Sequence, residues 1–240
     1  AFTMYGGTIS GNKATYDSSA WSGGNGGGVY VFWNAINGPG TFTMCGGSIA
    51  QNEALNGGGV YVADQSTFTM SGSSAISENT AASDDDDDGH GGGVYAGEDG
   101  TFHMSGGSIT GNKASSGGGV YIYKDGTFTT FTVSGAVKIN GNKGYFDHIT
   151  NNVRLSDGKT ITVKGALGGA EIGVTTATAP VAGSPITIAE GGGSHTVTAD
   201  DAKVFFADDL ENYCSEFAGG KVQLCEGTVH PVCGKVCNHT

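Results

Sequence analysis

Basic residues and proline are scarce in this sequence. Only 11 of the 240 residues are Lys or Arg, against 23 Asp or Glu, and the formal net charge is −12; Arg154 is the single arginine. Because a nucleic-acid interface needs clustered cations to neutralise phosphates, this composition predicts that nucleic acid is not a partner. The 4 prolines follow no Gly-X-Y period, which excludes a collagen helix.

Long apolar segments are missing as well. No apolar run reaches the roughly 18 residues of a membrane-spanning helix, and no basic segment leads into an apolar one at the start of the chain. We therefore expect no membrane insertion and no signal peptide within these residues. The chain begins at Ala1 in the middle of a repeat, so we expect further repeats to precede it in the parent protein.

Glycine, by contrast, supplies 45 residues, spread over most of the chain. Each glycine costs a helix interior roughly 1 kcal/mol relative to alanine, so long helices are disfavoured. The hydrophobic fraction of 37%, with 11 Phe and 9 Tyr, is nevertheless enough for a core, which excludes a disordered chain. The composition therefore argues for a folded chain and against a helix bundle.

An internal repeat organises most of the chain. Its first block is Phe-x-Met or a close variant, which begins at Phe2, Phe42, Phe68, Phe102 and Phe131. An isoleucine and then an asparagine follow in each copy, with the asparagines at Asn12, Asn52, Asn79, Asn112 and Asn142. The last block is Gly-Gly-Gly-Val-Tyr, which ends at Tyr30, Tyr61, Tyr95 and Tyr121. Apolar residues alternate with period two inside the blocks, which is typical of short strands.

A repeat of this length predicts a solenoid, a propeller or an array. The strand-like blocks are too short for propeller blades, so we predict an all-β parallel β-helix over residues 1–190, with three short strands per coil. Apolar side chains would stack in columns inside, the asparagines would form a hydrogen-bonded ladder, and the tyrosines would form an outward ladder. Residues 191–240 are predicted to be a C-terminal β cap with a tail that contains Cys and His.

Loops of the first coil carry candidate ligand-binding residues. Tyr16 and Trp21 lie between its asparagine and its glycine block, and Phe32 and Trp33 follow that block. Aromatic side chains on loops of a rigid scaffold suit stacking on glycans or contact with another protein. The alternative is that the tryptophans fold back over the glycine-rich face.

An insertion in the third coil holds an aspartate run. It adds Asp84, Asp86 and Asp88, followed by His90, as candidate ligand-binding residues. Carboxylates of this kind could bind Ca²⁺, although the run lacks the alternate spacing and the glycine of a dedicated calcium loop. The alternative interpretation is a solvated acidic run.

Four cysteines are concentrated near the C-terminus. In the tail, two thiols and two imidazoles lie close together, at His230, Cys233, Cys237 and His239. Such a set suits tetrahedral Zn²⁺, although the spacing matches no standard zinc finger. Disulfides such as Cys214–Cys225 or Cys233–Cys237 are the alternative, which export of the protein would favour. The sequence leaves this choice open, and Zn²⁺ and Ca²⁺ are the cofactors that it suggests.

The repeat also resembles known proteins. Gly-Gly-Ser-Ile-x-x-Asn followed by Gly-Gly-Gly-Val-Tyr is similar to the coil repeats of bacterial right-handed β-helix surface proteins, including chlamydial polymorphic outer membrane proteins. Residues 152–174 and the tail Cys-Gly-Lys-Val-Cys-Asn-His resemble segments of large repeat-containing surface proteins of gut Firmicutes. The resemblance implies a right-handed β-helix and an extracellular location, at the cell surface or secreted, and it carries no catalytic motif.

The sequence supports three functions. The first is a non-enzymatic adhesin-like or stalk segment that displays binding loops to glycans or to proteins of a host or neighbouring cell. The second is a carbohydrate-active enzyme, a polysaccharide lyase or hydrolase, because such enzymes share the fold, although the repeated strand faces carry Thr, Tyr and Ser rather than paired acids. The third is an architectural filament or coat segment that self-associates end to end.

Overall fold

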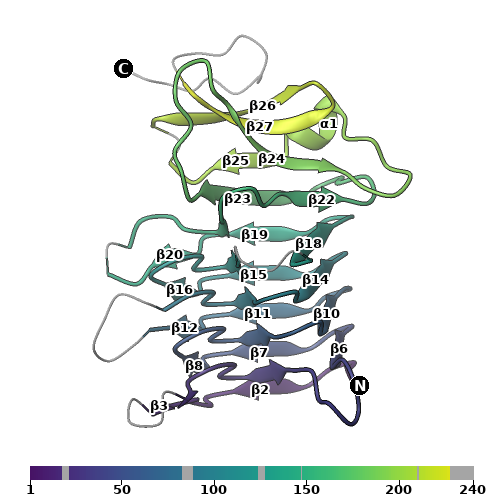
Figure 1. The fold of residues 1–240 in the computed structure, drawn as a ribbon, viewed down its shortest axis with the longest axis vertical. Coiled ribbons are helices and arrows are strands. Elements are labelled where there is room, and N and C mark those ends of the chain that lie inside the picture. The colour runs from purple at the N-terminus through teal and green to yellow at the C-terminus, as the bar shows by residue number, and fades with distance from the viewer. Residues whose placement is uncertain (18–21, 83–88, 124–127, 147, 210, 228–240) are drawn as a thin grey trace.

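The computed structural model describes residues 1–17, 22–82, 89–123, 128–146, 148–209 and 211–227. Its strands stack as the rungs of a parallel β-solenoid of about six turns, which leads into a C-terminal antiparallel segment (Figure 1). Equivalent blocks of neighbouring coils pair in register, as in Phe42↔Phe68 and Phe68↔Phe102. The prediction of an all-β parallel solenoid with a C-terminal cap is therefore confirmed.

The Phe-x-Met blocks form the first sheet. Its parallel strands, in order along the solenoid, are β1 (Phe2–Met4), β6 (Thr41–Met44), β10 (Thr67–Met70), β14 (Thr101–Met104), β18 (Thr130–Val133), β22 (Ile161–Val163) and β24 (Ile186–Gly191). Two antiparallel strands continue this sheet into the cap, β27 (Lys221–Glu226) and β26 (Tyr213–Ala218). The sheet therefore runs through both solenoid and cap.

The isoleucine blocks and the Val-Tyr blocks form the two halves of the second sheet. The isoleucine half contains β2 (Thr8–Ser10), β7 (Ser48–Ala50), β11 (Ala75–Ser77), β15 (Ser108–Thr110) and β19 (Lys138–Asn140). The Val-Tyr half contains β5 (Val29–Val31), β9 (Val60–Val62), β13 (Val94–Ala96), β17 (Val120–Ile122) and β21 (Val153–Leu155). Strand β23 (Glu171–Thr176) pairs with both β19 and β21 and so joins the halves, and β25 (Phe205–Ala207) pairs with β23.

Short additional elements complete the coils. Two-residue strands beside the asparagines form a third parallel sheet, with β8 (Glu53–Ala54), β12 (Thr80–Ala81), β16 (Lys113–Ala114) and β20 (Lys143–Gly144). The sequence did not indicate these strands, because two residues carry no periodicity. In the part of the chain described, the remaining elements are the antiparallel pair β3 (Tyr16–Asp17) and β4 (Ser22–Gly23) and the helix α1 (Ala199–Ala202).

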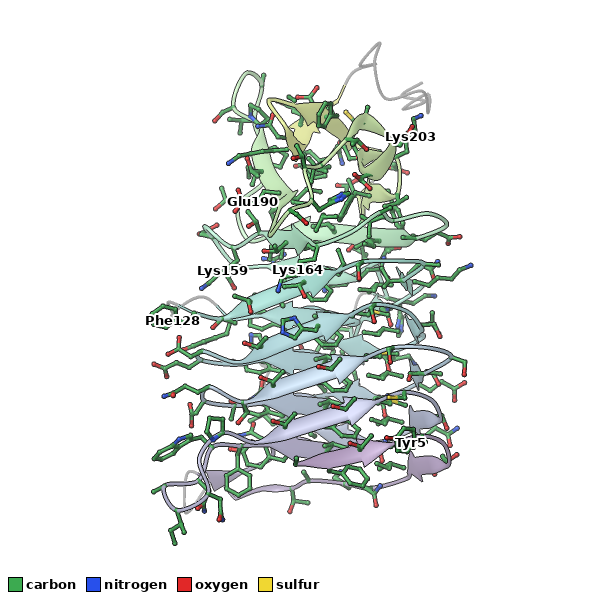
Figure 2. The ribbon with its side chains drawn as sticks, turned by 90° about the vertical axis from the view of Figure 1, so that its right-hand side faces the viewer. Tyr5, Phe128, Lys159, Lys164, Glu190 and Lys203 are labelled. Atoms are coloured by element: carbon green, nitrogen blue, oxygen red, sulfur yellow. The ribbon has the colours of Figure 1, made fainter. Side chains whose placement is uncertain are left out.

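The phenylalanine column shows how the core is built. Phe42, Phe68, Phe102 and Phe131 are buried, and their rings stack at centroid distances of 5.0, 5.0 and 4.9 Å. Burial stabilises each side chain by roughly 1.5–3 kcal/mol, and it is achieved only because the coils on either side cover the ring. Figure 2 looks onto the first sheet, whose strands lie one above another along the molecule.

The asparagine ladder is confirmed and is longer than the repeat indicated. In each step, the Oδ1 atom of one asparagine accepts hydrogen bonds from the backbone N–H and the side-chain amide of the preceding asparagine, at 2.9–3.1 Å. The ladder runs through Asn12, Asn52, Asn79, Asn112, Asn142 and Asn152. Most of these side chains are buried, so the ladder satisfies amides that would otherwise destabilise the fold.

Asp208 ends the ladder. Its Oδ1 atom accepts the side-chain amide of Asn152 at 2.6 Å, and its Oδ2 atom accepts the Asn152 backbone N–H at 2.7 Å and the Thr175 hydroxyl at 2.8 Å. Gly173 in β23 makes room, because a Cβ atom there would overlap the Asn152 amide and the Asp208 carboxylate. Burial raises the pKa of Asp208, although these hydrogen bonds act in the opposite direction.

Candidate functional site

Several of the predicted site residues lie outside the described residues. They are Trp21, Asp84, Asp86, Asp88, His230, Cys233, Cys237 and His239. Tyr16 lies in strand β3, and the description does not extend to its side chain. Calcium binding by the third-coil insertion and zinc binding by the tail therefore stay predictions. Among the residues that are described, no group of three or more His, Cys, Asp or Glu could hold a metal ion.

The tyrosine ladder lies on the outer side of the Val-Tyr half of the second sheet. Each tyrosine is the central residue of its strand, so its side chain points away from the core when the flanking residues point into it. Ring centroids are 5.2 Å apart for Tyr30 and Tyr61, 4.7 Å for Tyr61 and Tyr95, and 5.3 Å for Tyr95 and Tyr121. Exposure falls along the ladder from Tyr30, at 48%, to Tyr95, at 8%.

Phe32 extends the exposed end of this ladder, and Trp33 follows it in the chain. The Phe32 ring stacks on Tyr30 at a centroid distance of 5.5 Å, because residues two apart in an extended segment face the same side. Phe32 is 49% and Trp33 42% exposed. We call Tyr30, Phe32 and Tyr61 the aromatic surface. The structure thus brings one predicted ligand-binding residue, Phe32, together with two tyrosines of the repeat, whereas Trp33 makes no ring contact with them.

A closed turn holds this loop in place. The Asn34 carboxamide oxygen accepts the backbone N–H of Ile36 at 2.9 Å and of Asn37 at 3.2 Å, as is typical of an asparagine that begins a turn. The Asn34 backbone N–H donates to the Gly38 carbonyl at 3.0 Å and closes the loop. Ile36 at its tip is 90% exposed, so the loop presents apolar side chains to solvent on a defined backbone.

His90 lies further along the tyrosine ladder. Its ring meets Tyr121 edge-on at a centroid distance of 4.6 Å and Tyr95 at 6.4 Å. Its carbonyl accepts the Gly57 N–H at 2.9 Å, so the third-coil insertion rejoins the solenoid at this residue. His90 is therefore held against the ladder two coils away from Phe32, and the two do not belong to one compact site.

Burial and neighbouring groups raise the pKa of two tyrosines of the ladder. Burial, with smaller effects from Tyr30, Asp64, Tyr123 and Glu98, raises the pKa of Tyr61 to about 12. Burial and the charge of Asp64 also raise the pKa of Tyr30. Both phenols consequently remain protonated hydrogen-bond donors at neutral pH, and Asp64 supplies an acceptor beside them.

Sequence reasoning treated the tyrosines as structural and missed their part in the aromatic surface. A usable signal was present, since Phe32 follows Tyr30 at the spacing that places both side chains on one side of an extended chain. The interaction of His90 with the tyrosines had no comparable signal, because the length of an insertion does not fix where it rejoins the coil.

A separate cavity of about 380 Å³ lies beside the end of the first sheet. Its lining includes Asp157, Lys159, Glu190 and Lys221, and Figure 2 shows Lys159 and Glu190 on the same side of the molecule. Both acids have protein partners: Glu190 accepts from Lys221 at 3.1 Å, and Asp157 accepts from the Thr178 hydroxyl at 2.8 Å. The enzyme hypothesis gains no specific support from this arrangement.

Comparison of the chain with known protein families, curated proteins and solved structures found no match. The similarity to bacterial surface proteins therefore stays a prediction. No helix among the described residues has the length and apolar character needed to span a bilayer. The fold places the molecule in the class of parallel β-solenoids. Its first two coils carry the exposed aromatic surface.

Proposed function

We propose that this chain is a non-enzymatic segment of an extracellular surface protein, adhesin-like or stalk-like, and that its aromatic surface binds glycans. The observation that carries the proposal is the stack of Phe32, 49% exposed, on Tyr30, with Tyr61 against Tyr30 on the next coil. The C–H faces of sugar rings stack on aromatic rings of this kind, and rings fixed in advance lose little entropy on binding.

Polar groups around the rings suit the same ligand. The Tyr30 and Tyr61 phenols can donate to sugar hydroxyls, and Asp64 can accept from them. The solenoid supports the surface from behind, because Val29 and Val31 of the same strand pack against the core. A rigid scaffold that displays a small binding surface is the arrangement expected of a non-enzymatic binding module.

A glycan array followed by titration of the selected oligosaccharide tests the proposal. Tyr30→Ala and Phe32→Ala should each weaken binding by about 10-fold, equivalent to about 1.4 kcal/mol. Tyr5→Ala and Phe128→Ala are matched controls, because both side chains are exposed aromatics (Figure 2) on other segments, Tyr5 directly after β1 and Phe128 between β17 and β18. The controls should bind as the unmodified chain does.

Other outcomes of these experiments would contradict the proposal or favour another function. Absence of glycan binding, or equal losses in the control variants, would contradict it. Turnover of a polysaccharide would support the lyase or hydrolase alternative, and concentration-dependent polymerisation without glycan binding would support the filament or coat alternative. Binding to a host or neighbouring-cell protein that is lost in Phe32→Ala would support the same surface with a protein as its ligand.

A further inference from the structure

A second cavity, of about 310 Å³, lies where the solenoid meets the cap. It collects residues from five strands, with Arg154 from β21, Thr175 from β23, Ala207 at the end of β25, Tyr213 from β26 and Leu224 from β27. Strands β23, β25, β26 and β27 lie together in the upper part of the molecule in Figure 1, and β21 pairs with β23. The cavity is thus formed where the solenoid and the cap meet.

Arg154 occupies a distinctive position in the solenoid. It pairs in register with Tyr121 on one side and Thr175 on the other, so it replaces the tyrosine of the repeat in the next coil. It is the single arginine of a chain with a net charge of −12. Among the described residues, no ion pair or hydrogen bond involves its guanidinium group, although acids are abundant.

The two acids that line the same cavity are already satisfied by the protein. Asp208 accepts three hydrogen bonds from Asn152 and Thr175. Asp209 accepts the backbone N–H groups of Glu211 and Asn212, both at 3.2 Å, and the Asn212 side-chain amide at 2.9 Å. Each acid thus accepts three hydrogen bonds from the protein, whereas the Arg154 guanidinium has no such partner among the described residues, so its N–H groups can donate to an anion.

We propose that this cavity binds the carboxylate of a small organic acid through Arg154. A guanidinium presents paired N–H donors that match the two oxygens of a carboxylate. The apolar side chains of Val174, Pro180 and Leu224 line the remaining wall and suit the body of a molecule about as large as a monosaccharide. Sugar acids and acylated amino acids share this chemistry. The proposal is independent of glycan binding at the aromatic surface.

Titration followed by NMR tests the proposal on the whole chain. Because Arg154 is the single arginine, its Nε–Hε resonance is unambiguous. Galacturonate is compared with galactose, and N-acetylleucine with N-acetylleucinamide, so that each acid has a neutral partner of the same shape. We expect at least one acid to shift the Arg154 resonance in a saturable way and neither neutral partner to do so. The acid that binds identifies the source of the carboxylate.

Two variants separate binding from stability. Arg154→Gln should weaken binding of the acid by at least about 10-fold without a change in thermal unfolding, since the guanidinium has no hydrogen-bond or ion-pair partner to lose among the residues that the structure describes. Lys159→Gln, which removes a cation from the other cavity, should leave binding unchanged. Saturable binding that survives Arg154→Gln, or absence of any shift with either acid, would overturn the proposal. Tyr30→Ala should not affect this titration, so its outcome is separate from the glycan test.

Discussion

His103 interrupts the outward threonine column of the first sheet. It pairs in register with Thr69 and Thr132, and its Nδ1 atom lies 2.6 Å from the Thr132 hydroxyl oxygen. Burial, with a smaller effect from the charge of Lys164, holds the pKa of His103 below its usual value of 6.5. Figure 2 shows Lys164 on this sheet. The folded state therefore prefers the neutral imidazole.

This preference predicts a pH-dependent stability. An imidazole with a folded pKa below 6.5 contributes its stability above that pH and loses it as the pH falls through 6.5, because the unfolded chain then binds the proton more readily. His103→Thr, which completes the threonine column, should remove this loss. The variant should therefore gain stability relative to the unmodified chain, by a few tenths to about 1 kcal/mol between about pH 7.5 and pH 5, since the site is only half-buried.

Denaturant unfolding at several pH values measures this difference. His148→Asn is the control, because His148 is exposed and Asn tolerates its positive φ of 55°. A constant difference between His103→Thr and the unmodified chain at all pH values would contradict the prediction.

At the scale of elements, the hairpin of β26 and β27 forms most of the cap. Cys214 and Cys225 lie directly opposite each other in this hairpin, with their Sγ atoms 3.0 Å apart. The Ser215 hydroxyl donates to the Phe205 carbonyl at 2.6 Å and fixes the hairpin to β25. A covalent link between the strands would therefore stiffen the element that covers the end of the solenoid.

We expect Cys214 and Cys225 to form a disulfide under oxidising conditions. With glutathione disulfide as the oxidant, the two thiols lose their protons and two electrons, and the oxidant is reduced to two thiols. Closing this short loop should stabilise the cap by about 3 kcal/mol, measured by thermal unfolding with and without reductant. Peptide mapping should find the two cysteines linked, and Cys45→Ser should not alter the result. Stoichiometric zinc that is lost in Cys214→Ser would instead favour a metal site with the tail.

At the scale of the whole molecule, the sequence predicts what is repeated. Phe42, Phe68 and Phe102 recur with the same neighbours, so any solution that buries one of them buries all, and stacking is the arrangement that does so. The same logic predicts the asparagine ladder from Asn12 to Asn142. The repeat pattern was sufficient to predict the phenylalanine column and the asparagine ladder, because the residues that make each contact recur several times in the sequence.

The junction with the cap could not be predicted, since its contacts occur once. Asp208 ends the ladder and Gly173 makes room for it, yet neither residue has a repeated counterpart that would reveal the contact. The alternation Val-Arg-Leu at Arg154 does match Val-Tyr-Ile one coil earlier, and its register could have been inferred. The cavity beside it could not, because Leu224 and Asp208 reach it from distant segments.

The stacking of coils also predicts at which residues the loss of a side chain lowers the free energy of unfolding most. Phe102 is fully buried between two rings, whereas Phe2 stacks on Phe42 as its one ring partner among the described residues and is 55% exposed. Phe102→Ala should therefore cost about 3–5 kcal/mol of unfolding free energy, because it leaves a cavity that neighbouring coils cannot fill. Phe2→Ala, the same change in the same column, should cost well under half as much. Similar losses in the two variants, measured by denaturant unfolding, would show that the covering coils do not supply the stability of the column.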